Sequence, residues 1–170
     1  MFHAFDNLAP NKALGRADWM ALLSRAPPDL LECALATHLV AAPQWLRAPE
    51  TGLMMVQGRA GATGERFNLG EVTVTRCALR MSGAELDAAL VGVAYVLGRS
   101  YRQARLAAVA DALLQDGAQH ALLETTLLSP IRQHLALQSK QRHTRAQTTK
   151  VEFFTVAREA CDAGDDEEIQ

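Results

Sequence analysis

The run from Leu90 to Leu97 most constrains the fold of this chain, because it is apolar on both alternations of a strand. Such a run is either a strand covered on both faces or a buried helical segment. Its glycine, valine and tyrosine residues favour the strand. The run is far shorter than the roughly 18 apolar residues that span a membrane. The sequence therefore predicts a soluble protein built around a sheet.

Two short helices are predicted before this sheet. The apolar face that begins at Trp19 stops at Pro27-Pro28, and a second apolar face runs from Asp29 to Leu39. Proline ends one helix and can open the next, because its ring fixes φ and it has no N–H to donate. The first forty residues are therefore predicted to form a helical hairpin.

Extended segments are predicted between this hairpin and residue 76. Gln44–Arg47 and Leu53–Gln57 flank turn-forming residues, which predicts a β-hairpin. Glu71–Thr75 alternates with the period of a strand. The apolar positions then change parity, which predicts a β-bulge at Thr75-Arg76. Thr149–Val156 also has a strand-like pattern and is expected to return to the sheet.

Helical patterns follow the central strand. Ser100 is expected to cap an amphipathic helix over Arg102–Gln115. The apolar-rich segment His120–Leu128 is expected to end before Pro130, and the polar segment Ile131–Gln147 is expected to form a solvent-facing helix.

Together these elements predict an α+β fold with an antiparallel sheet of about four or five strands. We expect the amphipathic helix to pack on one face of the sheet, and the helical hairpin or a partner to pack on the other. One domain is predicted over residues 16–160, between a flexible N-terminus (residues 1–15) and a disordered acidic tail (residues 161–170).

Charge and cysteine content limit the possible function classes. The tail from Asp162 holds five acids, and the rest of the chain has 17 basic and 14 acidic residues. That balance is too weakly basic to indicate a nucleic-acid partner. The start of the chain does not resemble a secretory signal, and three widely separated cysteines fit reduced thiols. We expect a cytoplasmic protein with no membrane partner.

Four arginines are the candidate substrate-binding residues: Arg59, Arg66, Arg76 and Arg99. They lie at expected strand ends or in the glycine-rich loop 58–66, where a guanidinium can hold a phosphate or phosphonate through two hydrogen bonds. The loop lacks the spacing of a P-loop and can equally be a plain connection. The expected alternation would bury Arg76, whose partner is then a carboxylate such as Glu71, another subunit or an external anion.

No complete catalytic or metal-binding pattern is visible in the sequence. The five histidines have no ligand spacing. The carboxylates are isolated, so each could act as a general base only if a partner chain supplied the remaining groups: Glu65, Glu71, Asp87, Asp111 and Glu152. The surplus of apolar surface on the predicted strands indicates either an interface or a well-filled core.

Four separated segments resemble the G subunit (PhnG) family of carbon–phosphorus lyase. They follow the family's order and spacing, and the opening helix around Trp19 and the C-terminal Thr149–Arg158 also fit it. The matching segments are residues 52–56, 61–76, 95–99 and 111–115. The resemblance covers roughly residues 18–158.

The resemblance implies a subunit of a core complex with H, I and J subunits, joined by the L and K proteins at the complex level. In that family the I subunit, helped by the others, converts MgATP and an alkylphosphonate such as methylphosphonate to ribose 1-phosphonate 5-triphosphate and adenine. The iron–sulfur cluster and S-adenosylmethionine belong to the J subunit, and no cofactor is implied for this chain. The implied role is support of the I subunit, and the alternative is a subunit that grips the phosphonate or triphosphate with its arginines.

Three positions depart from the family pattern. Ser100 stands where an acid is usual, Gln103 where a histidine is usual, and Arg105 where an acid is usual. The departures make any family function at these positions doubtful in this chain, and they imply an altered partner surface at the start of this helix.

Overall fold

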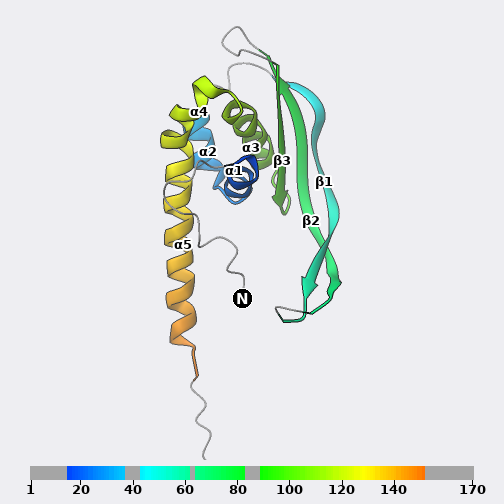
Figure 1. Cartoon of the computed structure of the whole chain (residues 1–170), viewed down its shortest axis with the longest axis vertical. Helices are drawn as coiled ribbons and strands as arrows, with labels where there is room; N and C mark the ends of the chain where they lie inside the picture. Colours follow the sequence, from blue (N-terminus) through cyan, green and yellow to red (C-terminus); the bar gives the residue numbers. More distant parts are fainter. Residues whose placement is uncertain (1–14, 37–42, 62–63, 83–88, 152–170) are drawn as a thin grey trace, which may run out of the picture.

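The described part of the chain, residues 15–36, 43–61, 64–82 and 89–151 of a computed structural model, has an α+β fold (Figure 1). The α+β class is therefore confirmed. Residues 1–14 and 152–170, which include most of the predicted flexible N-terminus and the acidic tail, lie outside the described residues. In chain order the elements are α1 (Arg16–Leu23), α2 (Pro28–Leu35), β1 (Gln44–Arg59), β2 (Arg66–Met81), β3 (Leu90–Leu97), α3 (Tyr101–Leu114), α4 (Gly117–Leu123), the π-helical turn η1 (Glu124–Leu128) and α5 (Ser129–Thr148).

The sheet is antiparallel, as predicted, but it has three strands in the described residues, in the order β1-β2-β3. The predicted hairpin between residues 44 and 57 is wrong, because this segment lies within the single 16-residue strand β1. Pro49 fits inside β1 because this strand lies at the edge of the sheet and its pairing with β2 shifts register between Arg47 and Glu50. The residues that resembled a turn are therefore part of the extended strand.

The predicted bulge at Thr75-Arg76 is also wrong. β2 pairs with β3 without interruption from Val74↔Leu97 to Met81↔Leu90, and the irregularity lies in β1 opposite this stretch. Because β2 alternates regularly, Cys77 and Leu79 are buried and Arg76 lies on the other face.

All the helices lie on one side of the sheet (Figure 1). The two predicted helices, α1 and α2, are confirmed, but both pack against α3 on the same side of the sheet as α3 itself, so they do not cover the second face of the sheet. That face has no cover within the described residues. Two covers were predicted for this face. The prediction that the helical hairpin covers it is wrong, and the prediction that a partner covers it is not tested by this structure.

Helix α3 forms the centre of the fold. From Ala104 to Leu114 every residue except Arg105 is buried, because small alanines let α3 approach the sheet on one side and the other helices on its other side. Gly92 marks the closest approach, since a Cβ at this position would lie 1.9 Å from the Ala108 carbonyl oxygen. The predicted capping residue Ser100 accepts a hydrogen bond from the Gln103 N–H at 3.4 Å.

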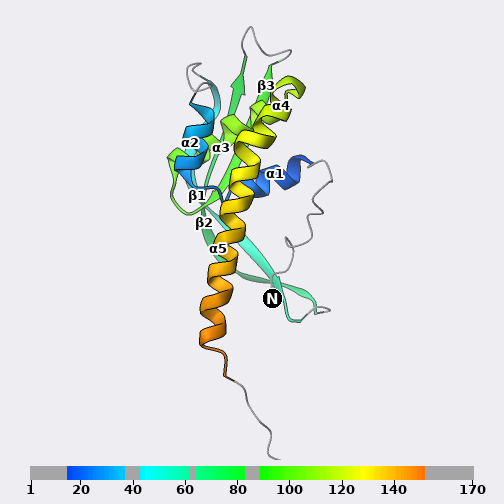
Figure 2. The same ribbon diagram turned by 90° about the vertical axis from the view of Figure 1, so that its left-hand side faces the viewer.

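The C-terminal helices run continuously through Pro130 instead of ending before it. Pro130 lies in the first turn of α5, directly after the π-helical turn η1, where the regular α-helical hydrogen bonding is already interrupted. The solvent-facing helix is confirmed: beyond Leu135 every described residue is exposed, and Figures 1 and 2 show this part of α5 extending past the other helices. Of the predicted strand 149–156, residues 149–151 belong to no strand and the rest lies outside the described residues.

Candidate interaction surface

The ends of β1 and β2 form a two-stranded arm, which we define as residues 53–59 and 66–73. Both views show it extending past α1, α2 and α3, apart from the long helix α5 (Figures 1 and 2). Large apolar side chains are exposed along it, by 44–66%: Leu53, Met54, Met55, Phe67 and Leu69. Consecutive residues of a strand point to opposite faces, so both faces of the arm are apolar. A hairpin of two strands is marginally stable in water, so this arm is built to pack against something else.

Two of the candidate arginines meet at the tip of this arm. Arg59 and Arg66 are direct cross-strand partners, and both are exposed. Like charges in this position repel each other, and no ion pair with a carboxylate is found for either within the described ranges. The tip is therefore a place where a carboxylate or a phosphate group would be stabilised.

The other two candidate arginines do not join this pair. Arg76 lies ten residues along β2 from Arg66, roughly 33 Å at the rise of a strand. Its Nε lies 2.8 Å from Oε1 of Glu50, which Arg47 also contacts at 2.8 Å. Arg99 is exposed in the turn between β3 and α3. The four arginines therefore do not form one anion site in this chain.

The ion pair of Arg76 corrects two expectations. Its side chain is 42% exposed rather than buried, and the carboxylate is Glu50 rather than Glu71. Hydrogen bonding from Arg76, and secondarily the charge of Arg47, lowers the pKa of Glu50 below its usual value. The geometry thus supports an ion pair within the chain, rather than an external anion, as the interaction of Arg76.

Asp111 is the polar centre of the fold, whereas the sequence patterns presented it only as one of five isolated carboxylates. Its carboxylate is fully buried and accepts four hydrogen bonds. Oδ1 accepts from Trp19 Nε1 at 2.9 Å and from Arg16 Nε at 3.2 Å, and Oδ2 accepts from Arg16 Nη2 at 2.7 Å and from the Val93 N–H at 2.9 Å. Hydrogen bonding to Asp111 raises the pKa of Arg16. This carboxylate is therefore not isolated: it joins α1, β3 and α3 and is not placed to be a general base.

The three unusual residues at the start of α3 have different surroundings. Gln103 donates from Nε2 to the carbonyl oxygens of Ser24 and Ala26 at 3.1 and 2.8 Å, so it holds the end of α1. Ser100 donates its N–H to Oγ1 of the buried Thr75 at 3.1 Å. Arg105 is exposed. Two of the departures therefore serve local structure.

The described residues contain no group of three or more histidine, cysteine, aspartate or glutamate side chains placed to hold a metal ion. Burial raises the pKa of the Cys77 thiol to about 11, and its Sγ donates to the Ala104 carbonyl, so it is not an activated nucleophile. Within the same residues no helix is long and apolar enough to cross a membrane.

This geometry defines a class: an α+β protein whose most developed surface is an apolar arm, as in subunits of larger assemblies. Comparison with known proteins identifies the family. The family model for the phosphonate metabolism protein PhnG matches residues 15–159, so this chain belongs to the PhnG family. The chain is 39% identical, over 148 residues, to the alpha-D-ribose 1-methylphosphonate 5-triphosphate synthase subunit PhnG of Rhizobium meliloti (strain 1021). The match covers 84% of this chain and 88% of the relative.

Proposed function

We propose that this chain is the G subunit of a complex that makes ribose 1-phosphonate 5-triphosphate and adenine from MgATP and an alkylphosphonate such as methylphosphonate. Its role is to support the catalytic I subunit, and its other partners are the H and J subunits and, at the complex level, the L and K proteins. The chain binds no cofactor itself, whereas the iron–sulfur cluster and S-adenosylmethionine belong to J. The complex acts in the cytoplasm, where MgATP is supplied.

The observation that carries this proposal is the apolar arm. A leucine that moves from water into a packed interface contributes about 1.5–3 kcal/mol. Leu53 and Leu69 are exposed by 66% and 60%, so burial of what remains exposed would contribute together roughly 2–4 kcal/mol, or about one and a half to three orders of magnitude in affinity. The arm is large enough to hold a subunit in place without any catalytic group of its own.

Co-expression with the other subunits tests the role of the arm. We expect the double variant Leu53→Ser, Leu69→Ser to lose the co-purifying partners, while its own unfolding free energy changes little because both side chains are exposed. The matched control is Leu122→Ser, which changes a leucine on α4 with 54% exposure. The chain alone should release no adenine from MgATP with methylphosphonate. Adenine release by the chain alone, or full assembly of the double variant, would contradict the proposal.

A second candidate function rests on the Arg59–Arg66 pair. If the tip of the arm reaches the reacting substrate, it binds the triphosphate or phosphonate of the complex directly. Arg59→Gln, Arg66→Gln should then leave the mass of the complex unchanged and raise KM for MgATP or methylphosphonate. The control is Arg105→Gln, which removes an exposed arginine on α3. Loss of assembly in the double variant would instead assign the pair to a carboxylate of a partner.

A further inference from the structure

Strand β3 offers a free edge whose backbone groups can be assigned from its hydrogen bonds. Within the described residues β3 pairs only with β2, and its neighbour Gly98 donates its N–H to the Thr73 carbonyl of β2. The Val93 N–H and the Val91 carbonyl instead bind side chains. Because backbone groups alternate in direction along an antiparallel strand, Val91, Val93, Tyr95 and Leu97 direct theirs away from the sheet.

Side chains close the first part of this edge. The Val91 carbonyl accepts from Arg16 Nη2 at 3.2 Å and from Gln115 Nε2 at 2.9 Å, and the Val93 N–H donates to Asp111 at 2.9 Å. Natural sheets commonly cover an edge in some such way to prevent unwanted pairing. No other strand can therefore pair at Val91 or with the Val93 N–H.

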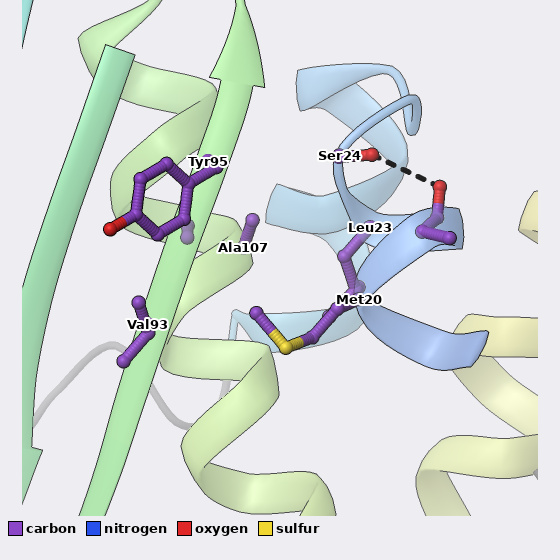
Figure 3. Close-up of a pocket in the computed structure, with 8 residues that line it drawn as sticks. Met20, Leu23, Ser24, Val93, Tyr95 and Ala107 are labelled. Carbon is purple, nitrogen blue, oxygen red and sulfur yellow. Dashed lines mark hydrogen bonds between the residues drawn. The ribbon is translucent and has the colours of Figure 1, made fainter. Parts of the chain in front are cut away.

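The second part of the edge is open and has a pocket beside it. No hydrogen bond to the Tyr95 N–H or carbonyl is found within the described residues. The pocket, of about 210 Å³, lies between α1 and β3 and is lined mainly by apolar groups, including Met20, Leu23, Val93 and Ala107. Figure 3 shows Met20 and Leu23 of α1 across the gap from β3. This volume is several times the roughly 30 Å³ of one water molecule, so it suits one large apolar side chain.

We propose that the edge of β3 from Val93 to Leu97 receives an extended segment of a partner subunit, which adds a strand to the sheet and places one large apolar side chain in this pocket. The proposal rests on membership of the chain in the proposed complex. The added strand is the kind of contact that one partner subunit makes, and the edge of β3 is a surface separate from the arm.

Two observations select this occupant. Helix α1 walls the groove, since Met20, Ala21, Leu23 and Ser24 line it. A single extended segment fits there, whereas the edge of a second copy would bring its own helices. Strand β3 continues beyond the groove into exposed Arg99, and none of the eight lining residues is acidic. The segment should therefore carry an acidic residue near its apolar anchor.

Amide hydrogen exchange at single-residue resolution tests the proposal, with the chain measured alone and in the co-expressed complex. We expect exchange at Tyr95 and Leu97 to slow by about 100-fold or more on assembly, because their N–H groups gain acceptors. The Val93 N–H is the internal control, since Asp111 already binds it in the chain alone. Unchanged exchange at Tyr95 and Leu97 in an intact complex would overturn this inference alone, whereas absence of the complex would overturn the proposed function.

The isolated chain distinguishes the other occupants. Protection of Tyr95 in the chain alone that does not depend on concentration would assign the edge to another segment of this chain. Protection that rises with concentration, together with a dimer mass, would assign it to a second copy. Either result overturns the proposal.

A pair of variants gives a second measurement. Tyr95→Pro removes the outward N–H, a change that an edge strand tolerates, and Tyr95→Ala removes the side chain only. We expect the proline variant to lose partner retention at least about tenfold relative to the alanine variant. Equal retention would contradict the added strand. If the proline variant does not fold, the exchange measurement on the unmodified chain decides.

Discussion

Asp111→Asn is the sharpest test of how this fold is held together. The carboxylate receives two donors at each oxygen, from Arg16, Trp19 and the backbone of Val93. An asparagine has one oxygen and an NH₂ group, so it can satisfy the donors on one side only. On the other side the NH₂ group faces donors that have lost their acceptor. Depending on the orientation of the amide, the donor left unsatisfied is the Trp19 indole N–H or the Val93 backbone N–H.

The loss follows from the burial of these groups. An unsatisfied buried donor costs about 1–3 kcal/mol. The Arg16 side chain is 45% exposed, so water replaces part of its lost bonding and its share is about 1 kcal/mol or less. We therefore expect the free energy of unfolding to fall by about 2–4 kcal/mol, which for a chain of this size lowers Tm by roughly 4–16 °C.

Asp116→Asn is the matched control. Asp116 is also buried, with 6% exposure, but its Oδ1 accepts only the Ala118 N–H, at 3.1 Å, at the start of α4. Asparagine caps a helix as well as aspartate does, so the loss should stay below about 1 kcal/mol. Urea unfolding of the purified chain, followed by circular dichroism, measures both. Equal stability of the two variants would refute the reasoning about the four hydrogen bonds.

Three further predictions concern other parts of the fold. With the pKa of Cys77 raised from 9.0 to about 11 by burial, iodoacetamide at pH 8 should alkylate the exposed Cys33 and leave Cys77 unmodified until the chain unfolds; simultaneous modification of both would contradict its burial. Gly92→Ala should destabilise the chain by several kcal/mol, because the added Cβ would lie 1.9 Å from a backbone carbonyl oxygen of α3. Gly52→Ala is the control, since a Cβ there would have nothing within 4 Å. Equal melting temperatures of the two variants would refute the close approach of α3 to β3. The lowered pKa of Glu50 means that its ion pairs stabilise the fold above its usual pKa of 4.5 and are lost as the pH falls through the lowered value. The stability difference between the protein and Glu50→Gln should therefore shrink as the pH falls below 4.5, and a difference that grows would contradict it.

Local signals in the sequence predicted the elements that depend on neighbouring residues. Pro27-Pro28 separates α1 from α2, Ser100 begins α3, and Leu90–Leu97 is a strand with the predicted bounds. Each of these features depends on residues that lie next to one another in the chain, where proline geometry, capping and strand propensity act directly.

The features that sequence patterns missed depend on contacts between distant residues. The partner of Arg76 is Glu50, which is 26 residues away, and the shift that places them together lies in β1 beside Pro49. Proline and glycine there resemble a turn locally, and only pairing with β2 keeps the segment extended. Asp111 did leave a signal: it follows Ala104 by seven residues and Ala107 by four, on the buried stripe of α3, so burial of its carboxylate and the need for donors could have been inferred.

Asp111 also links the stability of the fold to the edge that β3 offers a partner. Its Oδ2 holds the Val93 N–H, which comes immediately before the open stretch at Tyr95. When Asp111→Asn places its NH₂ group opposite Val93, this N–H becomes a free donor, and the unpaired edge grows by one donor position. Longer unpaired edges promote association between chains. We therefore expect concentration-dependent association in Asp111→Asn beyond that in Asp116→Asn, measured by light scattering below the unfolding transition. Equal association of the two variants would show that the carboxylate does not limit where this edge accepts a strand.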